Sequence, residues 1–165
     1  MEIRSLTEAD VDAFWSVRLR ALKEDPEAFG ASYEESVVTP IADIVKRLRS
    51  EAGIFVLGAF DPHLLGIVGF FQEQGDKRKH IGFIWGLYVI PEARGKRVGK
   101  LLMQEAIRRA SHYQAIEQIN LTVSNKAVKK MYESLGFTTY GSEPRALKIG
   151  QQYLDQDMMT LRLRE

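Results

Sequence analysis

Residues 87–110 read LYVIPEARGKRVGKLLMQEAIRRA, passing from the end of a strand through a basic, glycine-containing loop into a helix. The residues from Ile81 to Ile90 are almost all apolar, aromatic or β-branched, which is typical of a buried strand. Pro91 ends this strand, because proline has no N–H to donate to a sheet ladder. From Val98 onward apolar residues recur at helical spacing, and a helix is predicted to begin there.

The loop brings four cations to the start of the predicted helix: Arg94, Lys96, Arg97 and Lys100. A helix N-terminus carries partial positive charge and unpaired N–H groups, so cations are unfavourable there. A bound anion would resolve the conflict, and Gly95 and Gly99 would let the backbone approach it closely. A solvated basic loop accounts for these residues about equally well, and the spacing alone leaves both interpretations open.

A second motif follows the predicted strand that ends at Leu121-Thr122-Val123. Ser124 and Asn125 supply helix-capping side chains. Apolar side chains then recur at the i, i+3, i+4 and i+7 positions of an amphipathic helix, namely Val128, Met131, Tyr132 and Leu135. Gly136 stands where a helix C-cap belongs. On its own, Tyr132 also fits a core aromatic residue with a satisfied hydroxyl.

Together the two stretches resemble the GNAT superfamily of N-acetyltransferases. Residues 94–99, Arg-Gly-Lys-Arg-Val-Gly, resemble its acyl-CoA signature, Gln/Arg-x-x-Gly-x-Gly/Ala, with Arg97 in a position usually held by glycine. Residues 125–137 resemble its later motif, Asn-x-x-Ala-x-x-x-Tyr-x-x-x-Gly-Phe, with Val128 in place of alanine. The resemblance covers almost the whole chain.

The resemblance implies an acetyl-CoA-dependent N-acetyltransferase that transfers an acetyl group directly to a primary amine of a small molecule or peptide. CoA would lie between strands that splay apart near Leu87 and Thr122. Tyr132 would be catalytic and protonate the thiolate, while backbone N–H groups near residues 87–89 would stabilise the oxyanion. The CoA-binding residues would be Leu87, Tyr88, Val89, Arg94, Gly95, Lys96, Arg97, Val98, Gly99, Lys100 and Asn125. The alternative is a non-catalytic CoA-binding or sensing module.

An amine acceptor needs help to lose a proton. With a pKa of about 10.4, only about one lysine-like amine in two thousand is neutral near pH 7. The candidates for a base are His80, Glu34, Glu35 and Glu73, and the sequence assigns none of them. The chain has no cysteine, which excludes an acetyl-cysteine intermediate, and its three histidines lack metal-ligand spacing, so no metal is expected.

The remaining patterns predict an α/β fold, a GNAT-like mixed central sheet flanked by helices in the order β-α-α-β-β-β-α-β-α-β-β. A first helix follows a capping box at Thr7–Asp10 and ends near Asp25. The irregular segment at 24–36 is acidic and carries two aromatic residues, so it is either a wall for a cationic amine or a solvated loop whose aromatic residues cap the core. In the resembling family this region helps form the acceptor pocket, which favours the acidic wall. Ile41 is expected to be buried on the second helix. Strands are predicted at 2–6, 53–60, 64–72, 81–90, 117–123, 137–140 and 157–163, and further helices at 41–49, 98–110 and 125–135.

Composition places this chain among soluble proteins with one core. Its 165 residues predict a single domain over 1–165, with 45% hydrophobic and 27% charged residues. A net charge of +1 gives no global field toward nucleic acid. No apolar run is long enough to span a membrane and the N-terminus lacks a signal-peptide pattern, so no membrane contact and a cytoplasmic location are expected. A homodimer through the last strands is compatible with the sequence.

Overall fold

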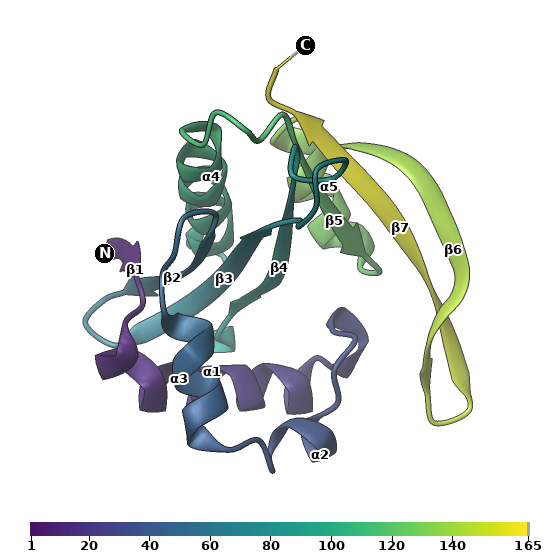
Figure 1. The fold of residues 1–165 in the computed structure, drawn as a ribbon. Helices are drawn as coiled ribbons and strands as arrows, with labels where there is room; N and C mark the ends of the chain where they lie inside the picture. Colours follow the sequence, from purple (N-terminus) through teal and green to yellow (C-terminus); the bar gives the residue numbers. More distant parts are fainter. Residues whose placement is uncertain (165) are drawn as a thin grey trace.

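The computed structural model describes residues 1–164 and contains one seven-stranded sheet in the order β1-β2-β3-β4-β5-β7-β6 (Figure 1). Its strands are β1 (Glu2–Ser5), β2 (Ile54–Phe60), β3 (Leu64–Gln72), β4 (Ile81–Val89), β5 (Gln118–Val123), β6 (Thr138–Ile149) and β7 (Gln152–Arg162). The α-helices are α1 (Val11–Glu24), α2 (Tyr33–Ser36), α3 (Ile41–Leu48), α4 (Val98–Ser111) and α5 (Lys126–Ser134), and short 3-10 turns are η1 (Glu8–Asp10), η2 (Pro26–Ala28) and η3 (Pro91–Ala93). The predicted fold class is confirmed, and the predicted element order holds apart from the additional short helix α2.

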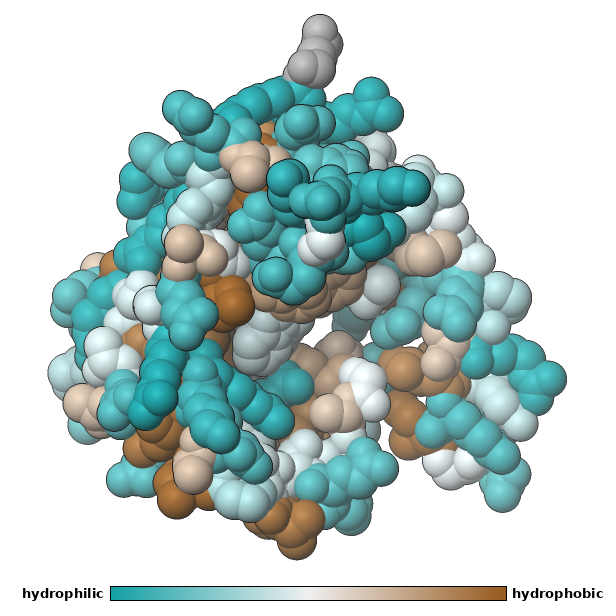
Figure 2. Space-filling view, viewed as in Figure 1, coloured by the Kyte–Doolittle hydropathy of each residue, from teal (hydrophilic) through white to brown (hydrophobic). Residues whose placement is uncertain are grey.

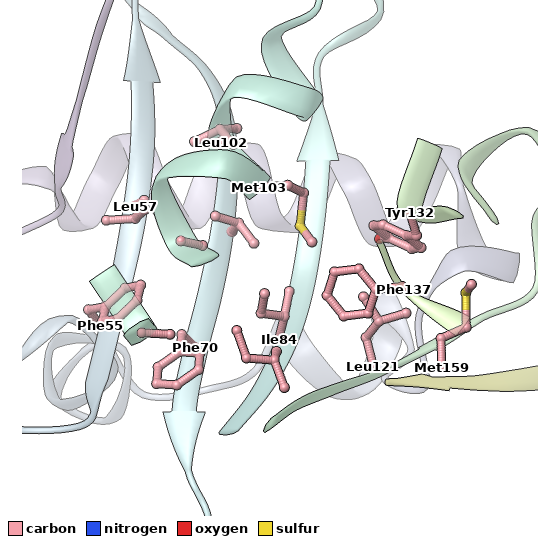
Figure 3. Close-up of a cluster of buried hydrophobic side chains, with 14 of the residues drawn as sticks. Phe55, Leu57, Phe70, Ile84, Leu102, Met103, Leu121, Tyr132, Phe137 and Met159 are labelled. Atoms are coloured by element: carbon pink, nitrogen blue, oxygen red, sulfur yellow. The ribbon is translucent and has the colours of Figure 1, made fainter. Parts of the chain in front are cut away.

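Each face of the sheet has its own hydrophobic cluster. Phe55 and Leu57 of β2 pack toward α4 and α5, whereas Val56, between them in sequence, packs toward α1 and α3. This is the alternation expected when helices cover both faces of a strand. The cluster beneath α4 and α5 includes Leu102 and Phe137, both at most 2% exposed, and Figure 3 shows it. The two helical layers therefore hold the central strands rigidly from both sides.

β4 and β5 run parallel, but they pair only at their first residues. Their register ends where Phe83 lies opposite Asn120. β4 nevertheless continues to Val89 beside β3, and β5 continues to Val123 beside β7. The two strands therefore separate into a wedge, which confirms the splay predicted near Leu87.

A β-bulge lies within the separated part of β4. Trp85 lies opposite Gly69 and Tyr88 lies opposite Ile67. Between these two pairs β4 advances by three residues and β3 by only two, so β4 contains one extra residue. Gly86 occupies the bulge with a φ of +68°, a conformation that favours glycine. Trp85 and Tyr88 consequently both pack on the α1 side of the sheet, although strict alternation would send them to opposite faces.

The last two strands are far longer than the predicted stretches at 137–140 and 157–163. Residues 138–149 and 152–162 form one continuous hairpin that turns at Gly150 and extends beyond the end of β5 (Figure 1). Most of its side chains are exposed, so the alternation of apolar residues that marks a half-buried strand is missing. Pro144 falls within a register irregularity between Glu143 and Leu147, a place where a strand tolerates proline.

Of the smaller predictions for the first three helices, some are confirmed and others are wrong. The main-chain N–H of Thr7 donates to Asp10, as the predicted capping box requires, and α1 ends before Pro26. The segment at 24–36 is not wholly irregular, because Ser32 caps the short helix α2. Ile41 is 54% exposed rather than buried, since it is the first residue of α3 and lies beyond the sheet. None of the described helices is long and apolar enough to cross a membrane.

Candidate functional site

A groove follows the open side of the wedge between β4 and β5, and its first half lies near the start of α4. A cavity of about 360 Å³, here called the loop cavity, is lined chiefly by Arg94, Gly95, Arg97, Val98, Gly99 and Lys100. A middle cavity of about 330 Å³ adjoins it, sharing Val89 and Gly99, and runs between residues 87–89 of β4 and the first turn of α5. The predicted loop and strand residues therefore lie along one channel, except Lys96, which lines neither cavity.

The second half of the groove lies at the β4 bulge. The bulge cavity, about 250 Å³, shares Leu87 and Asn125 with the middle cavity and is also lined by Arg18, Gly86 and Tyr132. It adjoins a hairpin cavity of about 570 Å³ between residues 30–34 and residues 146–149 of β6. Figure 2 shows a hollow in this face of the molecule beside the β6–β7 hairpin. The groove thus connects the basic loop, the bulge and an outer opening.

The start of α4 has the geometry of an anion site. Gly95 and Arg97 both have positive φ values, +77° and +62°, which turn the loop so that α4 begins at Val98. The Arg97 side chain makes no capping hydrogen bond, although its carbonyl accepts from Leu101 N–H. Arg97 therefore has a left-handed backbone, which glycine adopts most easily and which costs a residue with a side chain about 1 kcal/mol.

The cations of the loop divide into two roles. Arg94 donates to the Val89 carbonyl at 3.0 Å and to an Asp25 carboxylate oxygen at 2.7 Å, and it stacks over Tyr88. Its side chain therefore fastens the loop to the end of β4 and to the segment after α1. Lys96, Arg97 and Lys100, unlike Arg94, form no ion pair with any carboxylate among residues 1–164. The positive charge at the helix end therefore has no counter-ion among the described residues.

Asn125 and Tyr88 serve the fold as well as the groove. The Asn125 side-chain oxygen accepts from the N–H groups of Ala127 and Val128, at 2.8 and 3.1 Å, so it caps α5 as predicted. The Tyr88 hydroxyl donates to Glu24 at 3.1 Å, and burial together with Glu24 raises the pKa of Tyr88 to about 12. The Tyr88 ring packs with the hydrophobic cluster beneath α1, and Tyr88 also lines the middle cavity.

Tyr132 lies in the wall of the bulge cavity. Its ring is 6% exposed and packs against Phe137 with 5.9 Å between ring centroids (Figure 3). Burial raises the pKa of the Tyr132 phenol above its ordinary value, so the group stays protonated at neutral pH. Its hydroxyl has no hydrogen-bond partner among residues 1–164, which leaves it able to donate to a molecule in the cavity.

The backbone at the bulge offers further donors to the same cavity. Gly86 and Leu87 have no partner residue on β3, because the register shifts there, and β5 has already separated. Both residues line the bulge cavity. Backbone N–H groups at such a break in the register are suited to a developing negative charge on oxygen. Gly86 was not among the predicted site residues, although a lone glycine within a strand pattern signals a bulge.

Arg18 is the charged residue that sequence reasoning missed. It lies on the buried side of α1, is 8% exposed, and its guanidinium lies over the rings of Phe29 and Trp85, at 4.9 and 5.6 Å. Burial, with a smaller effect of Arg47, lowers the pKa of Arg18 to about 10, so it remains charged at neutral pH. The helical spacing from Phe14 and Leu22 could have placed it on the buried face, at the i+4 and i−4 positions.

The candidate bases lie in different places. His80 precedes β4 at the closed end of the wedge, roughly 20 Å along the strand from Gly86. Glu73 is hydrogen-bonded by Arg78, which lowers its pKa and makes it a weaker base. Glu35 is exposed on α2, whereas Glu34 lines the hairpin cavity next to the bulge cavity. Glu34 is therefore the candidate that the groove brings nearest to the bulge.

Solved structures of similar shape share this fold at low sequence identity. A GNAT-family acetyltransferase from Streptococcus pneumoniae has a TM-score of 0.86 at 21% identity, with 98% of each chain covered. YncA from Salmonella typhimurium, whose structure includes its cofactor acetyl-CoA, has a TM-score of 0.82 at 22% identity, covering 100% of this chain and 95% of that chain. A ribosomal-protein-alanine N-acetyltransferase from Brucella melitensis has a TM-score of 0.79 at 21% identity, covering 98% and 99%.

No curated protein sequence matches the chain. The model of the acetyltransferase (GNAT) family, in contrast, matches residues 16–137. This range includes the loop at 94–100, the β4 bulge and α5, which together form most of the groove. It covers well over half of the chain, so we conclude that the protein belongs to the GNAT family of acetyltransferases.

Proposed function

We propose that this protein is an acetyl-CoA-dependent N-acetyltransferase that transfers an acetyl group directly to a primary amine of a small molecule or peptide. The observation that carries the proposal is the continuous groove from the start of α4, past the β4 bulge, to Tyr132. Acetyl-CoA in the YncA structure and the name of the Brucella N-acetyltransferase support the donor and the reaction class.

In this proposal the loop cavity holds the pyrophosphate of CoA. The N–H groups of Val98, Gly99 and Lys100 begin α4 and have no residue four positions earlier inside the helix to accept from them. Together with the side chains of Lys100 and Arg97, they provide hydrogen bonds and positive charge to phosphate oxygens. The pantetheine arm then follows the middle cavity between β4 and α5, where Asn125 contributes its side-chain N–H₂.

The chemical step takes place in the bulge cavity. The neutral amine attacks the thioester carbonyl carbon, and a C–N bond forms as the carbonyl oxygen becomes an oxyanion. The backbone N–H groups of Gly86 and Leu87, in the bulge, stabilise this charge. The intermediate collapses with cleavage of the C–S bond, and Tyr132 donates its proton to the departing thiolate. The amine nitrogen gives up its extra proton to water, and a proton from water then restores the Tyr132 phenol.

Before the attack, the ammonium form of the acceptor loses a proton on the side of the bulge cavity that adjoins the hairpin cavity. No carboxylate or imidazole belongs to the described lining of the bulge cavity, so a water molecule is the proton acceptor there. Glu34, in the wall of the adjoining hairpin cavity, is the proposed final acceptor through water. We further propose that residues 1–165 act as one domain in the cytoplasm, and that the edge strand β6 is the site of any homodimer.

The test combines calorimetric titration of acetyl-CoA with a free-thiol release assay on amines, amino acids, aminoglycosides and peptides. Saturable acetyl-CoA binding and turnover on at least one acceptor would support the proposal. Binding with no turnover on any acceptor would instead favour the alternative, a non-catalytic CoA-binding or sensing module. An absence of acetyl-CoA binding would contradict both the enzyme and the CoA-binding module. It would indicate that Arg97, in the position usually held by glycine, prevents the loop from binding phosphate.

A further inference from the structure

Arg18 is a buried charge for which the described residues supply no counter-ion. Its Nη1 is fully buried and has no hydrogen-bond partner among residues 1–164, and no carboxylate of the described chain forms an ion pair with it. The Arg18 guanidinium lies over the rings of Phe29 and Trp85. A desolvated guanidinium without an anion is unfavourable, and buried charges in proteins are ordinarily paired. The arrangement therefore leaves a place for an external anion.

The guanidinium lies at the reacting end of the groove. It lines the bulge cavity together with Gly86 and Tyr132, whereas the basic loop at Arg97 borders a different cavity. A Cβ atom added to Gly86 would lie 3.3 Å from Arg18 Nη1, so the bare backbone of the bulge allows the close approach. The anion at Arg18 is therefore a group that reaches the bulge from the acceptor side, not a phosphate of CoA.

Two other features indicate the acceptor side. Ser124 Oγ, another buried polar atom without a partner, also lines the bulge cavity. The hairpin cavity, through which an acceptor would enter, has Lys23 and Lys148 in its wall and one carboxylate, Glu34. The cationic residues therefore outnumber the acidic one along the entry. This corrects the interpretation of residues 24–36 as an acidic wall, because Glu24 and Asp25 are held by arginines.

We propose that Arg18 binds a carboxylate of the acceptor, and that the substrate class is amino acids or short peptides whose carboxylate lies close to the reacting amine. This inference rests on the proposed N-acetyltransferase function. The planar fork of the guanidinium matches a carboxylate in two parallel hydrogen bonds. Ser124 Oγ adds a hydrogen bond to the same acceptor. Arg18 is thus a specificity-determining residue that positions the amine for attack.

The test compares acceptors that differ only in the carboxylate. Saturating acetyl-CoA is combined with amino acids and dipeptides, with their C-terminal amides and with the corresponding decarboxylated amines. Wild-type protein should show at least a roughly tenfold higher kcat/KM for the carboxylate member of its best pair, as expected for a charge-assisted hydrogen bond. This comparison needs no variant, so it holds even if substitution of Arg18 impairs folding.

Variants then assign the preference to Arg18. Arg18→Met should raise KM for the carboxylate substrate roughly ten- to hundredfold and leave the amide nearly unchanged, while Arg18→Lys should restore part of the preference. Arg47→Met is the matched control: Arg47 stacks over Trp15 outside the groove, and its loss should change KM less than about twofold. Acetyl-CoA affinity, measured by calorimetry, should be the same in all four proteins.

Three results would overturn the inference. Equal or better turnover of the amide by wild-type protein would show that no carboxylate is recognised. An equal loss for both members of a pair in Arg18→Met would show a purely structural role. Turnover confined to amines without a carboxylate would refute the inference and leave the proposed function intact, whereas acetyl-CoA binding without turnover on any acceptor would refute the proposed function itself.

Discussion

Replacing Tyr132 with phenylalanine separates the chemical role of the hydroxyl from the packing of the ring. The ring is 6% exposed and stacks beside Phe137, and phenylalanine keeps both contacts. The hydroxyl has no partner among residues 1–164, so no protein hydrogen bond is lost. The free energy of unfolding should change by less than about 1 kcal/mol, which is a shift of at most roughly 4 °C in Tm for a chain of this size.

The expected effect on turnover is much larger. The departing thiolate has a conjugate acid with a pKa near 8.5 if cysteine is the guide, and the buried phenol remains protonated from about pH 6 to 9. Loss of a positioned proton donor lowers kcat by roughly 10² to 10⁴, an increase of about 3 to 5 kcal/mol in the barrier. Calorimetry should show nearly unchanged acetyl-CoA affinity, because in the proposed mechanism the hydroxyl donates to the departing thiolate in the transition state rather than to bound acetyl-CoA.

The assay is thiol release at saturating acetyl-CoA with the best acceptor, measured across pH 6 to 9 beside thermal unfolding of both proteins. A kcat for Tyr132→Phe within a factor of about three of wild type would remove Tyr132 from the proton-donor role. A large fall in Tm would refute the statement that the hydroxyl makes no contact with the rest of the protein. A matched loss of acetyl-CoA affinity would assign Tyr132 to binding rather than to chemistry.

Other parts of the structure give predictions that are tested independently. Arg97→Gly should relieve the left-handed backbone and raise unfolding free energy by up to about 1 kcal/mol, while acetyl-CoA affinity falls and becomes less salt-dependent in calorimetry. Gly99→Glu should weaken acetyl-CoA binding at least roughly tenfold, because a carboxylate enters the phosphate site; unchanged affinity would contradict that site. Arg4 holds the pKa of Asp10 at about 2, so this pair stabilises the protein above about pH 4 and its contribution, about 1 kcal/mol, is lost as pH falls toward 2. Acid titration of Arg4→Met by circular dichroism should lack that loss.

Much of the donor half of the groove follows from local sequence. The apolar run of β4, the proline after it and the helical spacing after Val98 each have one dominant structural solution, and the two motifs lie at the predicted elements. Asn125 caps α5 for the same local reason. These features depend on neighbours within about ten residues, where turn chemistry and periodicity carry most of the information.

The acceptor half depends on contacts between distant residues and could not be predicted. Helical spacing from Phe14 and Leu22 places Arg18 on the buried face of α1, but only the position of α1 against the β4 bulge reveals that its guanidinium lies over Phe29 and Trp85 in the wall of the groove. Arg94 reads as a phosphate ligand, yet Asp25, which is 69 residues away in sequence, pairs with its side chain. The length of the β6–β7 hairpin was missed because its exposed strands lack the alternation that burial imposes.

The two ends of the groove differ in how readily their sequences can change during evolution. The donor end is built from β4, α4 and α5, whose side chains fill one of the two hydrophobic clusters, so most changes there cost stability. The outer opening is bordered by α2 and by the exposed part of β6, where substitutions typically change stability by less than about 0.5 kcal/mol. Mutation can therefore alter the range of amines accepted without loss of the cofactor site, and descendants of this fold can exchange substrates more easily than cofactors.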